Sequence, residues 1–200
     1  MRVLITGGGG FTGSRLASAF AGRGDKVVIF DVSFEDLSKE INNEEVVMVK
    51  GDIGNWPEVL NVVRDYNIDT IFHLAAILTV PSEANPWASI NINALGTFHV
   101  LEAARLFRVK KVLFTSSIGA YGVTQDTVVD EETVQRPTNI YGVSKVFGEL
   151  LGLYYHRKFG IDFRGLRLPG LLGPGVKTPG VAQYQPLVIE AAIKGEPFEV

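Results

Sequence analysis

A glycine-rich stretch near the N-terminus limits what this chain can fold into. Residues 6–13 read TGGGGFTG and follow the apolar run VLI. Glycines let the backbone turn sharply and let a phosphate approach the start of a helix, where free N–H groups and the helix dipole stabilise its charge. Because such a turn joins a strand to a helix, the stretch favours a fold in which strands and helices alternate.

Two nucleotide-binding spacings fit this stretch. Gly8, Gly10 and Gly13 form G-x-G-x-x-G, whereas Gly7, Gly10 and Gly13 form G-x-x-G-x-x-G. A plain strand-to-helix turn is the alternative, since glycines are common in such turns. The stretch alone therefore predicts a phosphate site without deciding which glycines form it.

The rest of the chain alternates in the expected way. Apolar runs predict strands at 3–6, 26–31, 46–50, 70–76, 111–117 and 163–168, and apolar periodicity with end signals predicts helices at 11–23, 56–66, 87–107, 141–158 and 186–194. Strands that are apolar throughout are typical of a parallel sheet buried on both faces. We therefore expect an α/β fold, a Rossmann-type doubly wound parallel sheet, over residues 1–168. Residues 169–200 begin with a stretch rich in proline and glycine, which predicts a separate, loop-rich segment.

The composition excludes several kinds of site and partner. The chain has no cysteine, so disulfides and thiolate metal sites are excluded, and its three histidines have no partner at metal-ligand spacing. A net charge of −3 gives little support to nucleic-acid binding. No apolar run reaches the roughly 18 residues of a membrane span. We expect a cytoplasmic protein with a small-molecule substrate, no metal, no nucleic-acid partner and no membrane association.

Acidic residues end the second strand and follow the third. Asp31 lies 18 residues after Gly13, close to the spacing of about 20 typical of an acid that binds a ribose 2′-OH. A carboxylate there disfavours the extra phosphate of NADP, so the cofactor expected is NAD; a turn-capping role is the alternative. Asp52 and Ile53 are expected at the adenine end of the cofactor, and Asp52 is almost as well explained as a turn residue.

A tyrosine and a lysine share one face of the helix expected at 141–158. Tyr141 and Lys145 are four residues apart, and an adjacent ammonium is expected to lower the pKa of a phenol so that it acts as a general acid/base. Tyr154 and Lys158 repeat the spacing, but they lie about 20 Å further along the helix. Because cofactor chemistry occurs where helices begin, at the carboxyl ends of parallel strands, Tyr141 and Lys145 are preferred.

Hydroxyl groups close the fifth strand, which reads KVLFTSS up to Ser117. One of them could hold a substrate oxygen against Tyr141. The alternative is that they satisfy backbone groups at the strand end, which is a common use of serine and threonine.

The motifs TGGGGFTG, TSSIGAYG and YGVSK occur in this order, together with HLAA at 73–76 and LRLPG at 166–170. As a set they resemble the extended short-chain dehydrogenase/reductase superfamily, and within it the NAD-dependent epimerase/dehydratase family. The resemblance implies that Ser117, Tyr141 and Lys145 are catalytic. It also implies that Gly8 and Gly9 are permissive positions and that the cofactor is bound by Gly7, Gly10, Phe11, Thr12, Gly13, Leu74, Ala75, Ala76, Asn93, Tyr141, Lys145 and Pro169.

Two substrate classes compete within this family. The stretch from TVQRP to LRLPG is similar to the L-threonine 3-dehydrogenases, which favour an aromatic residue where this chain has Leu168. Leu168 and LLGPG at 171–175 look more like the nucleotide-sugar epimerases, which are the leading expectation. A non-catalytic NAD-binding sensor is the alternative class, but a sensor has no need of Ser117, Tyr141 and Lys145 together.

The resemblance also implies how the chain assembles and where it is incomplete. Family members commonly form homodimers through helices that correspond to 87–107 and 141–158. They continue well past the position of Val200, which ends this chain in the strand-like stretch EPFEV. Residues 169–200 are therefore expected to be the start of a smaller, incomplete C-terminal substrate lobe.

Overall fold

The structure is a computed structural model that describes residues 1–35, 37, 44–123, 128–173 and 184–198. These residues form one six-stranded parallel sheet in the order β3-β2-β1-β4-β5-β6. The strands are β1 (Arg2–Thr6), β2 (Lys26–Asp31), β3 (Val46–Lys50), β4 (Thr70–His73), β5 (Lys111–Ser117) and β6 (Asp162–Leu168). The order reverses direction between β1 and β4, so the prediction of a Rossmann-type doubly wound sheet is confirmed.

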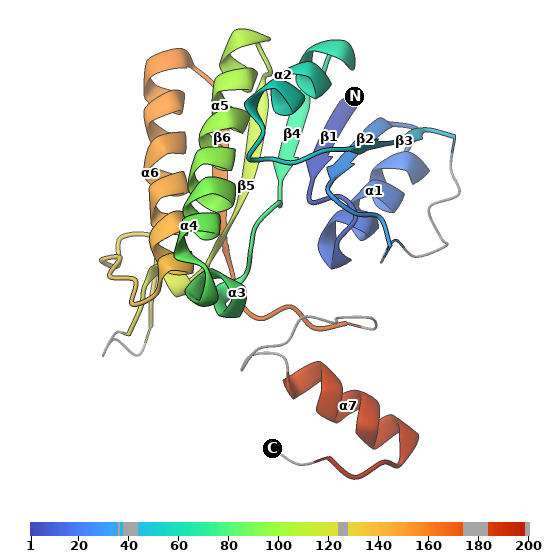
Figure 1. The fold of residues 1–200 in the computed structure, drawn as a ribbon, viewed down its shortest axis with the longest axis vertical. Coiled ribbons are helices and arrows are strands. Elements are labelled where there is room, and N and C mark those ends of the chain that lie inside the picture. The colour runs from blue at the N-terminus through green and yellow to red at the C-terminus, as the bar shows by residue number, and fades with distance from the viewer. Residues whose placement is uncertain (36, 38–43, 124–127, 174–183, 199–200) are drawn as a thin grey trace.

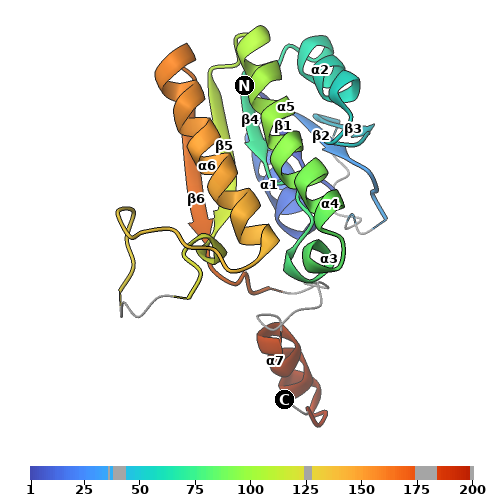
Figure 2. The same cartoon turned by 60° about the vertical axis from the view of Figure 1, so that its left-hand side comes forward.

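Helices cover both faces of this sheet. The main helices are α1 (Phe11–Gly22), α2 (Trp56–Asp65), α5 (Gly96–Leu106) and α6 (Ile140–Phe159). Helices α2, α5 and α6 lie side by side over one face, and α1 lies over the other (Figures 1 and 2). Helix α7 (Tyr184–Lys194) lies apart from the sheet, beyond the carboxyl ends of the strands (Figure 1).

Side chains alternate between two cores along each central strand. Leu4 of β1 packs in the cluster with α2 and α5, whereas its neighbours Val3 and Ile5 pack in the cluster with α1. All three side chains are completely buried. Burial on both faces explains why these strands are apolar throughout, as a parallel sheet requires.

The helix expected at 87–107 is a composite. It begins as α4 (Pro86–Ser89), continues as a π-helical segment η1 (Ile90–Leu95) and ends as α5. The Gly96 N–H group bonds to the Asn91 carbonyl, five residues back, which is the π-helical pattern. Apolar periodicity predicts the length of this helix but does not reveal the change in winding.

Three further differences from the expected elements occur, two of them near β4. Strand β4 ends at His73 instead of residue 76, because β1 ends at Thr6, its partner in the register. A short helix α3 (Thr79–Ala84), which contains a proline, follows in a stretch without helical periodicity. A 3₁₀ turn η2 (Ile118–Ala120) follows β5 and was also not expected.

Helix α6 lies close to β5 and β6 because glycines face the sheet. A Cβ atom at Gly148 would lie 2.5 Å from the nearest ring atom of Phe114, and one at Gly152 would overlap the ring of Phe163. Helix and sheet thus approach closely at both positions. This close packing places the N-terminal turn of α6 beside the end of β5.

Part of the C-terminal region lies outside the described residues. This applies to the last two residues of LLGPG, at 174–175, and to the last two of EPFEV. The division of the chain at residue 168 therefore stays a prediction. In the described part of the chain, no helix is long and apolar enough to cross a membrane.

Candidate active site

A cavity of about 610 Å³ lies at the carboxyl edge of the sheet, where strand order reverses. This is where doubly wound sheets bind ligands. All but one of the predicted site residues line the cavity: Gly7, Gly10, Phe11, Thr12, Gly13, Asp31, Asp52, Ile53, Leu74, Ala75, Ala76, Ser117, Tyr141, Lys145 and Pro169. The exception is Asn93.

The glycine loop forms one wall of this cavity. Gly7 has a φ of +70°, and a Cβ atom there would lie 2.7 Å from the Ala75 nitrogen. A Cβ atom at Gly13 would overlap the Gly7 carbonyl. Gly10 is the N-cap residue of α1 and offers no side-chain cap to the first-turn N–H groups. The loop therefore leaves a helix N-terminus open to an anion, with space that side chains would otherwise fill.

Gly8 and Gly9 are not permissive positions, and the prediction that they are was wrong. A Cβ atom at Gly8 would overlap the Ile29 side chain, and one at Gly9 would overlap the Ser33 carbonyl. All four consecutive glycines are thus packed against other segments or face the cavity. The sequence spacing identifies the glycines that line the cavity but not those that pack against β2 and the segment after it.

Asp31 lies at the end of β2, beside the loop. Its Oδ2 accepts a hydrogen bond from the Gly9 N–H group at 2.9 Å, so the carboxylate holds the glycine loop as well as facing the cavity. Asp52 Oδ1 accepts from the Gly54 N–H group at 2.8 Å, which is the turn role considered as its alternative. The ribose and adenine roles of these residues stay predictions.

Tyr141 and Lys145 lie in the first turns of α6, beside the end of β5. Asn139 caps this helix, its Oδ1 accepting from the Gly142 N–H group at 2.7 Å. Lys145 Nζ donates to the Thr115 carbonyl at 2.7 Å and lies 5.3 Å from the centroid of the Tyr141 ring. Tyr154, of the competing pair, is half-exposed and does not line the cavity.

The ionisation of this pair differs from the expectation. Burial lowers the pKa of Lys145 to about 8. Burial also raises the pKa of Tyr141, and a hydrogen bond with Ser117 acts in the opposite direction without reversing the shift. The predicted lowering of the phenol pKa by Lys145 was therefore wrong for this structure. The ammonium donates to the Thr115 carbonyl and lies against the ring, so its charge does not offset the burial of the phenol.

Asn93 lies behind the cavity wall and not in it. Its side chain is 3% exposed, its Oδ1 accepts from the Ile77 N–H group at 2.8 Å, and its Nδ2 donates to the Ile77 carbonyl at 2.9 Å. Asn93 is therefore not among the residues that line the cavity, and its predicted place near the cofactor stays a prediction. Asn93 instead fixes the backbone at Ile77, which does line the cavity.

His73 is a buried residue between β1 and η1–α5, and its contacts define its tautomer. Thr97 Oγ1 donates to the Asn93 carbonyl at 2.6 Å, so it accepts from His73 Nε2–H at 3.0 Å. His73 Nδ1 then accepts from the Thr6 hydroxyl at 2.7 Å. Complete burial, with the charge of Lys145, lowers the pKa of His73 to about 3, so the ring is neutral. Among the described residues, no cluster of His, Asp or Glu could hold a metal ion.

Sequence reasoning missed several apolar residues that line the cavity: Phe30, Val32, Gly51, Ile77, Leu78, Ile92 and Leu171. Most lie next to predicted site residues at strand ends, and that adjacency is the signal that could have found them. Ile92 is different, because it lies in η1, whose winding the sequence did not reveal.

A sheet of this order, with a glycine loop after β1 and a Tyr–Lys pair on the helix after β5, is the arrangement of the extended short-chain dehydrogenases/reductases, and this chain is one of them. A family model described as the NAD dependent epimerase/dehydratase family matches residues 3–200. The chain therefore belongs to that family.

Individual relatives agree with this assignment. An uncharacterized epimerase/dehydratase of Staphylococcus haemolyticus is 37% identical over 184 residues, which are 90% of this chain and 56% of the relative. The UDP-glucose 4-epimerase of Thermus thermophilus, solved with NAD, has a TM-score of 0.87 and 30% identity, covering 99% of this chain and 64% of that one. The L-threonine dehydrogenase of Clostridium difficile has a TM-score of 0.91 and 31% identity, covering 100% and 63%. The chain thus spans little more than half of the curated relative and less than two thirds of the solved chains.

Proposed function

We propose that this chain binds NAD and belongs to an enzyme that oxidises a secondary alcohol carbon of a small-molecule substrate. The observation that carries the proposal is that Ser117, Tyr141 and Lys145 meet in the same cavity as the glycine loop and Asp31. The donor set fits a dinucleotide, because the open N-terminus of α1 suits a pyrophosphate and an acid at the end of β2 suits a ribose. Membership of a family described as NAD dependent also supports it.

Each residue of the catalytic set has a proposed task. Ser117 holds the substrate oxygen, and Tyr141 takes the hydroxyl proton as general base. Lys145, which lies beside the Tyr141 ring, binds the nicotinamide ribose. When bound, NAD supplies the acceptor for the hydride that leaves the substrate carbon. Because burial raises the pKa of Tyr141, the charge that makes it a base has to be stabilised in the assembled complex.

The leading substrate class is a nucleotide-sugar, with epimerase or dehydratase chemistry. Leu168 lines the cavity, at the position where the L-threonine 3-dehydrogenases favour an aromatic residue. The name epimerase/dehydratase given to the Staphylococcus haemolyticus relative also supports this class. An L-threonine dehydrogenase is the second candidate, and its support is the similarity to the Clostridium difficile enzyme.

A substrate screen that follows NADH absorbance separates these classes. An epimerase is expected to interconvert a UDP-sugar pair, such as UDP-glucose and UDP-galactose, with no net NADH. L-Threonine that yields NADH steadily would favour the dehydrogenase. If NAD binds and no substrate of either class reacts, the non-catalytic sensor becomes the better account.

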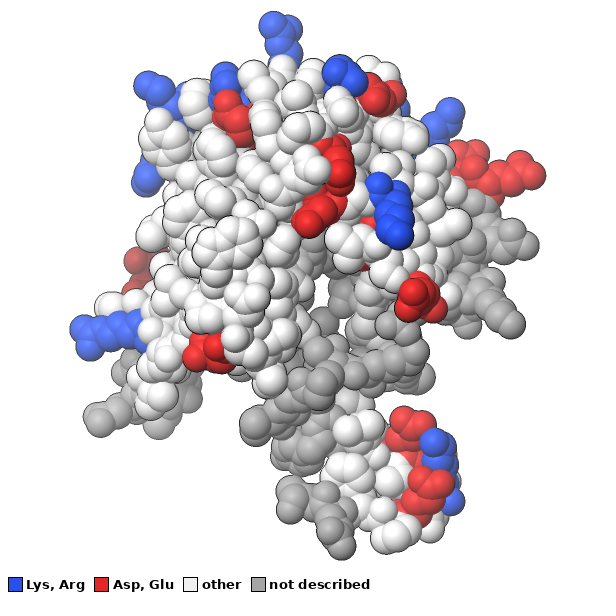
Figure 3. All heavy atoms as spheres, in the orientation of Figure 1, with Lys and Arg blue, Asp and Glu red and all other residues white. Residues whose placement is uncertain are grey.

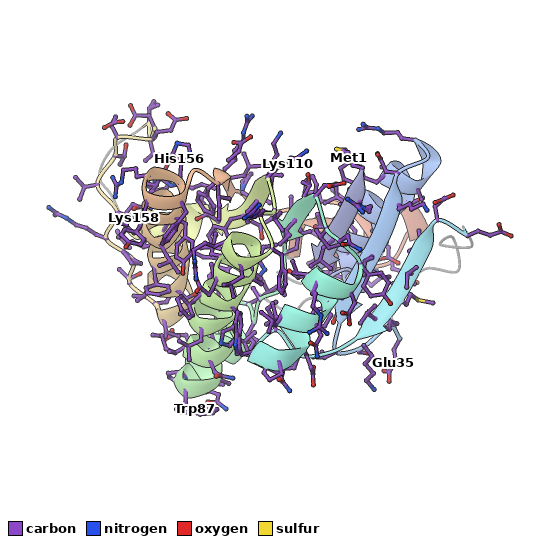
Figure 4. All side chains as sticks on the ribbon, turned by 90° about the horizontal axis from the view of Figure 1, so that it is seen from above. Met1, Glu35, Trp87, Lys110, His156 and Lys158 are labelled. Carbon is purple, nitrogen blue, oxygen red and sulfur yellow. The ribbon has the colours of Figure 1, made fainter. Side chains whose placement is uncertain are left out.

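We also propose a homodimer through α5 and α6. The exposed side of α6 carries Val143, Phe147, Leu150 and Tyr154, a spacing that makes one apolar stripe. Figure 3 shows few charged side chains over α5 and α6 in this view. Trp87 is 77% exposed and points away from the body of the protein (Figure 4). An exposed apolar patch of this kind is typical of an interface.

A further inference from the structure

A buried polar cluster lies behind the end of β5 and has no part in the chemistry proposed above. Its centre is Glu149 of α6, which is 9% exposed. Glu149 Oε1 accepts a hydrogen bond from Ser116 Oγ. Its Oε2 accepts from Arg167 Nη2 at 2.7 Å and from Gln135 Nε2 at 2.8 Å. Arg167 Nε lies 3.0 and 3.1 Å from the two oxygens.

This carboxylate is ionised in spite of its burial. Burial raises the pKa of Glu149, but the hydrogen bonds from Arg167 and Ser116 outweigh that effect, so the pKa lies below its usual value. A buried charge is costly unless its partners occupy its hydrogen-bonding positions, and here both oxygens are engaged. The cluster therefore ties α6, β5 and β6 together with directional bonds.

The spacing along α6 connects this cluster to the candidate active site. Three residues at intervals of four share one face of the helix and contact three successive residues at the end of β5. The pairs are Tyr141 with Ser117, Lys145 with the Thr115 carbonyl, and Glu149 with the Ser116 hydroxyl. The first two pairs lie in the cavity, and Glu149 does not line it.

The same cluster also holds the chain on the far side of Ser117. Arg167 Nη1 donates to the Tyr121 hydroxyl at 2.9 Å, and that hydroxyl donates to the Asp130 carbonyl at 2.8 Å. Along the chain, Ser117 thus lies between Ser116, which is hydrogen-bonded to Glu149, and Tyr121, which is hydrogen-bonded to Arg167.

We propose that Glu149, held by Arg167, is a positioning residue that sets β5 against α6 and so aligns Ser117 with Tyr141. The proposal rests on the catalytic role proposed for Ser117 and Tyr141. Glu149 acts through Ser116 and touches neither substrate nor cofactor.

The test follows the ionisation of Tyr141 in the full chain, without cofactor. Phenolate absorbance is recorded during alkaline titration, and the same titration of a Tyr141→Phe counterpart is subtracted. In both Ser116→Ala and Glu149→Gln, the pKa of Tyr141 is expected to rise by about half a unit, because its hydrogen bond with Ser117 is weakened. Loss of the negative charge of Glu149 would by itself lower the pKa of Tyr141. An upward shift of that pKa therefore indicates that Ser117 and Tyr141 are no longer aligned.

Glu102→Gln is the matched control. Glu102 of α5 is also paired with an arginine, Arg105, and accepts from the Tyr155 hydroxyl of α6 at 2.8 Å. Tyr155 lies 14 residues, or about 21 Å, along α6 from Tyr141. This variant is expected to lower stability and leave the Tyr141 titration unchanged.

The proposal is overturned if Tyr141 titrates at or below its wild-type position in both test variants. Should Glu149→Gln fail to fold, Ser116→Ala decides, since it removes one hydroxyl group and no charge. The titration requires no cofactor. Failure of the wild-type chain to bind NAD would therefore overturn the proposed function and leave the result on Glu149 intact.

Discussion

Asp31 combines a structural bond and a proposed binding role in one carboxylate. Its Oδ2 accepts from the Gly9 N–H group, and the side chain also lines the cavity. Spacing along the chain predicts that an acid ends β2 near the glycine loop. The hydrogen bond between Gly9 and Asp31 depends in addition on the path that the glycine loop takes, which the spacing does not reveal. Removal of the whole side chain would therefore disturb the loop as well as any contact with a ribose.

Two substitutions at Asp31 separate these effects. Asp31→Asn keeps an oxygen that can accept from the Gly9 N–H group, and Asp31→Ala does not. Both are expected to bind NADP about tenfold better relative to NAD, since the repulsion of the 2′-phosphate is lost. Asp31→Ala is also expected to weaken NAD binding further than Asp31→Asn. Titration with each cofactor measures this, and an unchanged NADP-to-NAD ratio would remove Asp31 from the account of cofactor choice.

Most residues of the candidate site could be predicted because strand ends and helix spacing are local properties. Tyr141, Lys145 and Ser117 lie at places that the chain itself marks, and the structure brings them together. The position of Asn93 and the pKa direction of Tyr141 could not be predicted, because each depends on which distant segment approaches. Asn93 bonds to Ile77, and the burial of Tyr141 comes from the assembled sheet and helices.

At the scale of elements, regular strands and helices were predictable and the irregular pieces were not. Strands β2, β3 and β5 have the expected bounds, because apolar runs with clear stops define them. The π-helical segment η1 and the short helix α3 have no periodicity of their own. The close approach of α6 to the sheet is another property that only packing reveals, through Gly148 and Gly152.

Alanine substitutions at two glycines test that packing. Gly152→Ala is expected to lower the free energy of unfolding by about 1–3 kcal/mol, because the new methyl group overlaps the Phe163 ring; this outweighs a gain in helix propensity of about 1 kcal/mol. Gly22→Ala in α1 is the control, since nothing lies within 4 Å of its Cβ position, and it should not destabilise. Urea unfolding measures both. Equal stability of Gly152→Ala and wild type would mean that α6 does not lie as close to β6 as described.

At the scale of the whole molecule, one sheet order brings the carboxyl ends of all six strands to one edge and so builds the cavity. The doubly wound parallel sheet was predictable from the alternation of elements and the glycine loop, and the structure adds its strand order. The apolar stripe on α6 was not predictable, since it becomes visible only when the helix is packed against the sheet. The proposed dimer follows from this stripe and from the family resemblance.

A charge placed in the stripe tests the dimer. Leu150 is 58% exposed on α6, and Met48 is 54% exposed on β3, away from the stripe. Leu150→Glu is expected to convert a dimer to a monomer, because a buried unpaired carboxylate is costly. Met48→Glu should leave the dimer intact. Sedimentation or light scattering gives the mass, and a wild-type monomer at micromolar concentration would contradict the proposal.

The substitution Tyr141→Phe tests the proposed role of Tyr141 as the acid/base of an NAD-binding site. The variant keeps the aromatic ring and removes the hydroxyl group. We expect NAD affinity within about twofold of wild type and a fall in kcat of about 10²–10⁴-fold, the usual contribution of general acid–base catalysis. The measurement pairs an NAD titration with turnover of whichever substrate the wild-type chain converts. Undiminished turnover by Tyr141→Phe would show that Tyr141 is not the acid/base.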